Sequence, residues 1–413
     1  MFEFGRDLRK LFAQARESDD LAWLELIGVD LLETEARQQS VDAGRVSCPR
    51  PFEAELRAAR LWREHARRAG SNGSLERAQR AAAYAARAAK TGDEAARAAI
   101  EAARVELLRF DLCGGLGALA RALGGLNQAA EPKSGQTALS LAAARAAAAA
   151  RQARLEGSAE MKRAALSALD AAVAALGSAQ GMDEDALRLD RASLALELGV
   201  EARDTGLLDR AGQDLRDLVQ AASPDYRPLT RARALVLCAA GMSALANLGD
   251  HVEARRQADA LFEAAAKQFT PDHSPLDWAA IQVVRAESGG ADLLDLARAE
   301  ALTAGSGLVV GALAAIARWR EEARLAEADG DLAGLATLEA RLLDRLRAGP
   351  SALDWAGAQV AVAETALARQ RLTGAQPHAL GLILAEAALC AREQAAPLLA
   401  WRAERLLDSA VVP

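Results

Sequence analysis

The sequence from Ser274 to Val283, SPLDWAAIQV, recurs from Ser351 to Val360 as SALDWAGAQV. In each copy a serine stands three residues before an aspartate. This order predicts a helix N-terminus, because the serine oxygen accepts a backbone N–H and the acid favours the positive helix end. The copies lie 77 residues apart (355 − 278). Half of that offset, about 38 residues, matches the period of a two-helix repeat.

The composition favours helices along nearly the whole chain. Hydrophobic residues make up 51% of it and aromatic residues only 4%. Alanine, leucine and arginine, which are strong helix formers, take their place, and β-branched residues are sparse. No segment has the sustained alternation of a strand. The sequence therefore predicts an all-α fold, with helices of about 15 to 22 residues joined by short turns.

Glycine-marked turns carry a family resemblance. The segment from Gly249 to Ala254, followed by Ala258 and Leu261, resembles the turn and second helix of a tetratricopeptide repeat (TPR). The segments beginning at Gly206 and Gly73 follow the same spacing. The tryptophan segments also look like repeat starts in some bacterial TPR-like proteins, although the Leu-Gly pair expected after such a start is Arg285-Ala286 in one copy.

This resemblance implies an α-solenoid of stacked antiparallel helical hairpins, a TPR-like superhelix. A single hairpin cannot bury its apolar face, whereas stacked hairpins share a continuous core and leave an extended concave surface. In the family that surface binds peptides or protein segments. The resemblance is clearest over residues 200–410 and weak before 200, so a generic α-solenoid without TPR geometry stays open.

The repeat register places four polar residues on the expected inner surface. Projection from Gly249 selects Ser243 and Asn247, and projection from the tryptophan motifs selects Glu287 and Glu364. We expect these four residues to contact a protein partner; the alternative is that they are ordinary exposed polar residues.

A break in the pattern suggests two regions. The stretch from Gly124 to Gly135 is rich in glycine and polar residues, and it predicts a long loop. Residues 1–130 then form an N-terminal helical region with a cap and degenerate repeats, and residues 131–413 form the TPR-like repeat region.

Net charge and the absence of targeting signals limit the classes of partner and the cell compartment that we expect. The formal net charge of −7 and the pI of about 5.4 argue against a nucleic-acid binder. The charge is uneven, with a local +5 over residues 50–109 and a local −5 over residues 183–217. The N-terminus lacks the basic-then-apolar order of a secretory signal, and no apolar run approaches about 18 residues, so we expect a cytoplasmic protein.

The N-terminus is the one segment that suggests membrane or partner contact. Aromatic and apolar residues interleave there with Arg6, Arg9 and Lys10, as in a short amphipathic helix. Docking onto the solenoid as a cap is the favoured alternative. The apolar residues are Phe2, Phe4, Leu8, Leu11 and Phe12.

The sequence contains no convincing motif for catalysis, metal binding or cofactor binding. None of the four histidines has another histidine or a cysteine at metal-ligand spacing, and the four cysteines lie far apart. Gly115-Leu-Gly117-Ala-Leu-Ala120 fits the dinucleotide fingerprint, but that fingerprint needs a βαβ context. The sequence thus predicts no catalytic residues, no metal and no cofactor.

These observations favour a non-catalytic scaffold, a cytoplasmic bacterial adaptor that binds a protein or peptide segment in a superhelical groove. Repeat-end contacts are compatible with a homodimer. The alternatives are a ligand- or peptide-responsive regulatory sensor, an all-α enzyme with a scattered active site, and a structural component of a large assembly.

Overall fold

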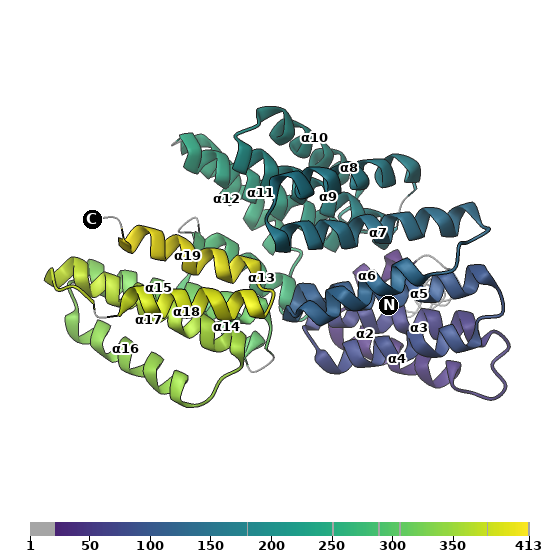
Figure 1. The fold of residues 1–413 in the computed structure, drawn as a ribbon, viewed down its shortest axis with the longest axis horizontal. Helices are drawn as coiled ribbons and strands as arrows, with labels where there is room; N and C mark the ends of the chain where they lie inside the picture. Colours follow the sequence, from purple (N-terminus) through teal and green to yellow (C-terminus); the bar gives the residue numbers. More distant parts are fainter. Residues whose placement is uncertain are drawn as a thin grey trace, which may run out of the picture. The chain divides into compact units, whose positions relative to one another are not determined.

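A computed structural model describes residues 21–179, 181–249, 252–287, 290–304, 307–377 and 379–411. These residues form eighteen α-helices and one 3-10 helix, with no strand among them (Figure 1). The elements are η1 Ala22–Leu26, α2 Val29–Ala43, α3 Pro51–Ala69, α4 Asn72–Ala88, α5 Gly92–Cys113, α6 Leu116–Gln128, α7 Gly135–Glu156, α8 Ala159–Leu176, α9 Met182–Ala202, α10 Thr205–Ala221, α11 Pro228–Gly249, α12 Val252–Ala266, α13 Pro275–Glu287, α14 Leu293–Thr303, α15 Val309–Ala328, α16 Leu332–Arg347, α17 Ala352–Thr373, α18 Leu380–Glu393 and α19 Pro397–Val411.

The chain divides into two compact units, each made of two separate stretches of sequence. The first unit is Met1–Thr34 with Ser158–His273, and the second is Glu35–Gly157 with Ser274–Pro413. The amphipathic segment expected at residues 2–12 lies outside the described residues.

Helix packing within each unit follows one rule. In the second unit α3 packs against α4 and α5, α5 against α6 and α7, α15 against α16 and α17, and α17 against α18 and α19. In the first unit α9 packs against α10 and α11, and α11 packs against α12. Six of the described helices thus contact both the next helix and the next odd-numbered helix: α3, α5, α9, α13, α15 and α17. This is the packing of stacked helical hairpins, and it confirms the all-α solenoid.

Two arginine pairs between odd-numbered helices have the same sequence spacing. Arg97 on α5 binds Glu53 on α3 through two hydrogen bonds of 2.6 and 2.9 Å, 44 residues apart. Arg371 on α17 binds Glu327 on α15 at 2.5 and 2.7 Å, again 44 residues apart. Bidentate arginine–carboxylate pairs are among the stronger polar contacts. They connect odd-numbered helices of successive hairpins, so part of the arginine content holds the repeats together.

The predicted tryptophan motifs are helix starts and packing anchors. Ser351 is the N-cap of α17, and its Oγ accepts the Asp354 N–H at 3.2 Å. Ser274, before α13, donates its Oγ–H to Asp277 at 2.6 Å. Trp278 is buried, and Trp355 packs against the core formed by α15, α17, α18 and α19.

The loop expected at residues 124–135 is shorter than the sequence indicates. Gly124 and Gly125 lie inside α6, so only residues 129–134 connect α6 to α7. The Asp93 carboxylate at the start of α5 accepts the backbone N–H groups of Lys133 and Ser134 at 2.8 and 2.9 Å. Because α6 packs against α5 and α7, packing outweighs the low helix propensity of the two glycines. The division at residue 130 falls at this short loop, inside the second unit, and stays a prediction.

The dinucleotide-like glycines have a structural role. Residues 105–110, which the fingerprint would need as a strand, lie within α5. Gly114 caps α5 with φ 70° and ψ −156°, a conformation open almost only to glycine. The next residue, Gly115, donates its N–H to the Gln394 carbonyl at 2.7 Å. A Cβ on Gly114 would collide with that same carbonyl oxygen. The α5–α6 turn therefore packs closely on the α18–α19 turn.

Gly114→Ala combines backbone strain with this collision, so we expect it to lower the free energy of unfolding by roughly 3 kcal/mol. Gly374→Ala is the matched control, because Gly374 also caps a helix with φ 70° but a Cβ there meets no atom within 4 Å. Its cost should be about 1 kcal/mol. Urea denaturation measures both, and equal effects would contradict the close approach.

Candidate functional site

The structure brings two of the four predicted partner-contact residues together on one arginine. Arg402 on α19 donates Nη2–H to Glu364 on α17 at 2.9 Å and Nη1–H to Glu287 at the end of α13. Arg320 on α15 also donates to Glu287, at 3.1 Å, and to the carbonyl of Ala286 at 2.8 Å. Four successive odd-numbered helices therefore meet at one ion-pair cluster.

The charges of this cluster are balanced within it. The side chains of Glu364 and Arg402 are 9% and 13% exposed. Burial alone would raise the pKa of Glu287, but Arg402 and Arg320 outweigh it and hold that pKa below its usual range. The pKa of Arg402 is raised, because Glu364 and Glu287 outweigh the effect of its burial. A partner that bound either glutamate would have to displace these arginines.

The other two predicted residues belong to α11. Ser243 is half-buried on this helix and follows Met242, which lines an apolar groove. The side chain of Asn247 lies outside the described residues. Their role as partner contacts stays a prediction.

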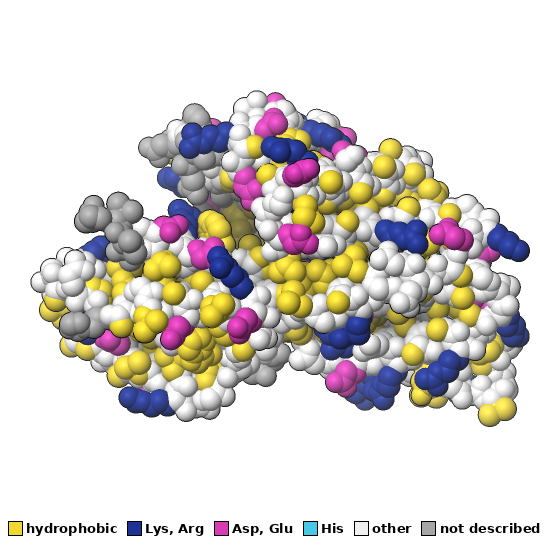
Figure 2. Space-filling model, in the orientation of Figure 1, with side chains coloured by type: hydrophobic (Ala, Val, Ile, Leu, Met, Phe, Trp, Pro, Cys, Tyr) yellow, Lys and Arg dark blue, Asp and Glu magenta, His cyan; other side chains and the backbone are white. Residues whose placement is uncertain are grey.

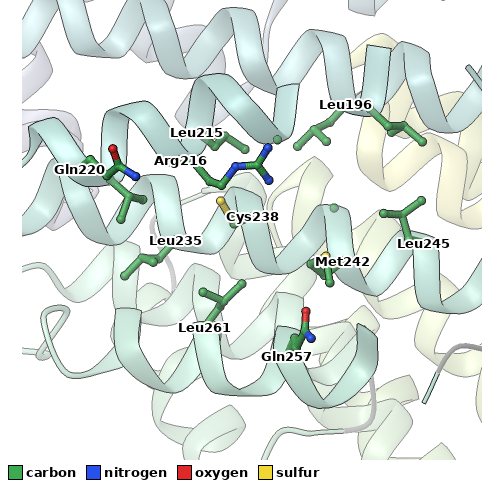
Figure 3. Close-up of a pocket in the computed structure, with 14 residues that line it drawn as sticks. Leu196, Leu215, Arg216, Gln220, Leu235, Cys238, Met242, Leu245, Gln257 and Leu261 are labelled. Atoms are coloured by element: carbon green, nitrogen blue, oxygen red, sulfur yellow. The ribbon is translucent and has the colours of Figure 1, made fainter. Parts of the chain in front are cut away.

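The apolar groove beside Met242 lies in the first unit and has a volume of about 320 Å³ (Figure 3). Four successive helices form it: α9, α10, α11 and α12. Leucine side chains dominate its walls, and Arg216, Gln220 and Gln257 add polar groups. Its lining consists of Leu196, Leu208, Gly212, Leu215, Arg216, Val219, Gln220, Leu235, Cys238, Gly241, Met242, Leu245, Gln257 and Leu261.

Local sequence explains why the groove stays open. Gly212 and Gly241 place no side chain in its walls, and a Cβ on Gly241 would lie only 3.1 Å from Leu196. Asp204 starts α10 by accepting the N–H groups of Gly206 and Leu207 at 2.9 and 3.2 Å. The turn that contains Gly206 thus sets the start of α10 beside the groove, and Gly249 is the last residue of α11.

The helix α11 carries apolar side chains on the faces that pack in the core and on a further face as well. Residues Pro228–Ala246 are long and apolar enough, by length and composition alone, to cross a membrane. In the first unit this helix packs against α9, α10 and α12, as a core helix does. Cys238, Met242 and Leu245, at intervals of four and three, form a second stripe that lines the groove. This stripe is the sequence signal for the groove that our sequence analysis missed.

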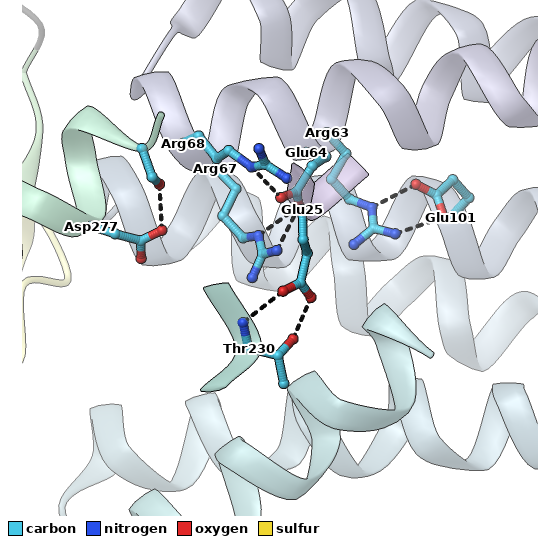
Figure 4. A network of polar contacts seen from close by, with 9 residues as sticks. Glu25, Arg63, Glu64, Arg67, Arg68, Glu101, Thr230 and Asp277 are labelled. Atoms are coloured by element: carbon cyan, nitrogen blue, oxygen red, sulfur yellow. Dashed lines mark hydrogen bonds and ion pairs between the residues drawn. The ribbon is translucent and has the colours of Figure 1, made fainter. Parts of the chain in front are cut away.

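The N-terminal part of the first unit fixes the start of α11 (Figure 4). The fully buried Glu25 carboxylate accepts the backbone N–H of Thr230 at 2.8 Å and also the Thr230 hydroxyl. A carboxylate at this position satisfies an N–H of the first helical turn and favours the positive helix end.

The basic stretch at residues 50–109 is largely paired within the second unit. Arg63 donates to Glu101, which is 1% exposed, at 2.7 Å (Figure 4). The fully buried Arg68 donates to Glu64 at 2.6 Å. These pairs stabilise α3 and α5 and leave less free positive charge than the sequence count indicates.

Metal-ligating side chains do not gather in the described part of the chain. No group of three or more His, Cys, Asp or Glu residues there is arranged to hold a metal ion. Cys238 faces the groove, and burial raises the pKa of its thiol more than the nearby Arg216 lowers it.

Comparisons with known proteins add little to this geometry. No family model matches the sequence, and no curated protein matches it significantly. Among solved structures the chain is similar to a "Circular tandem repeat protein with novel repeat topology and enhanced subunit contact surfaces", at 16% identity over 93% of this chain and 95% of that one. The TM-score is 0.24, too low to support any argument about repeat geometry or function. The internal packing defines the chain as an all-α helical-repeat protein.

Removal of Arg402 tests whether the ion-pair cluster holds the hairpins together. Arg402→Met leaves Glu364 buried without its partner, so we expect the free energy of unfolding to fall by roughly 3 kcal/mol. The double variant Arg402→Met/Glu364→Leu should recover most of the loss, because it removes the uncompensated charge. Arg256→Met, in a solvent-exposed pair with Glu253, should leave the melting temperature unchanged. A double variant less stable than Arg402→Met would contradict this interpretation.

The lowered pKa of Glu287 predicts an acid-sensitive contribution to stability. A carboxyl with a folded pKa below its ordinary value of 4.5 stabilises the fold above about pH 4.5, and this stabilisation is lost as the pH falls through 4.5 toward the folded pKa. Glu287→Gln should therefore show a shallower loss of stability in this window than the parent chain does. Urea midpoints measured from pH 7 to pH 3 provide the comparison, and parallel curves would contradict the ion pairing.

Proposed function

We propose that this chain is a non-catalytic scaffold that binds a segment of another protein in the groove formed by α9, α10, α11 and α12. In this proposal it is a TPR-like adaptor of bacterial type that acts in the cytoplasm. The second unit contributes a stable helical array, and the first unit contributes the binding surface.

One observation carries the proposal: the groove is apolar, about 320 Å³ in volume, and lined by successive hairpins of the array. Its size is at the lower end of the range for binding pockets. An amphipathic helix that binds a hydrophobic groove buries its apolar face there, and repeat proteins present extended surfaces of this kind. The TPR-like spacing from Gly206 and Gly249, on the helices that form the groove, supports the finer class.

A second surface favours the alternative of an assembly component. The hairpin of α18 and α19 exposes large apolar side chains, and the face of α18 and α19 presented in Figure 2 carries several hydrophobic groups. Exposed large apolar side chains that lie together suit self-association, for example in a homodimer. The exposed residues are Leu382, Leu389, Leu398 and Trp401, at 61%, 58%, 63% and 55% of their full exposure.

Two substitutions separate these functions. Leu245→Glu adds a charge at the groove edge, where Leu245 is 36% exposed, and should abolish capture of the stoichiometric partner in affinity purification from the native cell. Leu382→Arg, on the exposed face of α18, should leave that capture intact and abolish self-association in analytical ultracentrifugation if the second function holds. Unchanged partner capture by a folded Leu245→Glu chain would contradict groove binding.

A further inference from the structure

Arg216 is the one charged residue among the described residues that line the groove. The other lining residues are apolar side chains, glycines, Cys238 and the two glutamines Gln220 and Gln257. In Figure 3 the Arg216 guanidinium extends from α10 over the groove, on the side of Leu196 and above Cys238. Arg216 is an exposed residue, and its positive charge at the edge of an apolar surface attracts an anionic group.

No described carboxylate neutralises Arg216. Its Nη2–H donates to the amide oxygen of Gln213 at 2.9 Å, and no described Asp or Glu oxygen lies within the 4.0 Å of an ion pair. Neighbouring arginines of the same unit are paired: Arg191 binds Asp214 at 2.7 Å, and Arg210 binds Asp170. The charge of Arg216 is therefore available to a ligand in the groove, whereas the charges of Arg191 and Arg210 are neutralised by their partners.

The groove has the length of a short helix. From Leu208 to Gln220 along α10 is about 18 Å, and from Leu235 to Leu245 along α11 is about 15 Å, at the α-helical rise of 1.5 Å per residue. These lengths match roughly three turns of a docked helix, on which apolar residues at positions i, i+4 and i+7 face one side.

We propose that the groove recognises an amphipathic helical segment of another protein that places a single carboxylate against Arg216. This rests on the proposed function and adds the charge chemistry of the partner. The apolar face of the segment fills the groove, and its Asp or Glu receives the guanidinium, which binds carboxylates with high directional selectivity.

The lining of the groove favours a single carboxylate on the partner. Arg216 is the one charged residue among the described residues that line the groove, and the rest of the lining is apolar or neutral. One carboxylate can pair with Arg216, whereas a second one would meet apolar side chains and lose its hydration without gaining a partner. The segment is therefore apolar with one acid rather than a run of acids.

Cys238 gives the experiment a reporter inside the groove. Its thiol lines the groove, whereas Cys48, Cys113 and Cys390 lie in the second unit and serve as internal references. Iodoacetamide labelling of each cysteine in the full chain is followed by mass spectrometry. The probes are two helical peptides of about twelve residues with leucines at i, i+4 and i+7, one with a central glutamate and one with lysine in its place.

We expect the glutamate peptide to slow labelling of Cys238 alone, with roughly ten-fold tighter binding than the lysine peptide. In Arg216→Glu the preference should reverse. Arg163→Glu, at an exposed arginine of α8 outside the groove, should keep the parent preference. This reversal is the result that a purely structural role of Arg216 would not produce.

Each contrary result identifies what has failed. Equal protection by both peptides would overturn the role of Arg216 and leave groove binding standing. Protection by neither peptide would overturn the proposed function as well. Labelling of Cys238 that slows as the protein concentration rises, with no peptide present, would assign the groove to a second copy of the chain and overturn the proposal. Faster labelling of Cys238 in the variant Phe4→Ser/Phe12→Ser would assign the groove to the chain's own N-terminal segment. That result would also overturn the proposal.

Discussion

A hairpin of alanine- and leucine-rich helices cannot bury its apolar surface alone, and the rest of this structure depends on that constraint. The helices α3, α5, α9, α13, α15 and α17 solve it by packing against both the next helix and the next odd-numbered helix. Alanine makes this double contact close, as in the core of α5, α6 and α7, where Ala103, Ala122 and Ala148 are almost fully buried. A core of small side chains gains less from burial per residue, so the stack requires additional contacts between hairpins.

Arginine supplies those contacts. Its long side chain spans the distance between odd-numbered helices, and its planar guanidinium binds a carboxylate bidentately, which lysine cannot do. The pairs Arg97–Glu53 and Arg371–Glu327 both span 44 residues and connect successive hairpins. At Arg402 the same chemistry joins three helices at once. Partly buried pairs of this kind contribute more to the register of the hairpins than to net stability, because desolvation offsets much of the attraction.

Sequence reasoning predicted the features that depend on local pattern and missed those that depend on distant neighbours. The capping serines, the helical repeats and the shared face of Glu287 and Glu364 follow from spacing alone. Arg402 was not predicted, because α19 lacks the tryptophan motif that sets the register elsewhere. Arg216 was not predicted, because only the folded first unit shows that no described carboxylate pairs with it, whereas Arg191 and Arg210 are paired.

Taken together, the ion-pair cluster and the groove use one kind of residue in two ways. In the second unit Arg320 and Arg402 neutralise Glu287 and Glu364, the two glutamates that the repeat register predicted as partner contacts. The charges of these odd-numbered helices are therefore paired within the array. In the first unit Gly212 and Gly241 place no side chain in the wall of the groove, and Arg216 lines it with no described carboxylate as its partner. A repeat whose charged side chains pair with one another contributes to the stability of the array. A repeat that leaves an apolar groove beside an unneutralised cation has the chemistry of a binding site. We therefore expect this chain to bind its partner where an arginine beside an apolar groove is not paired with a carboxylate of the chain itself.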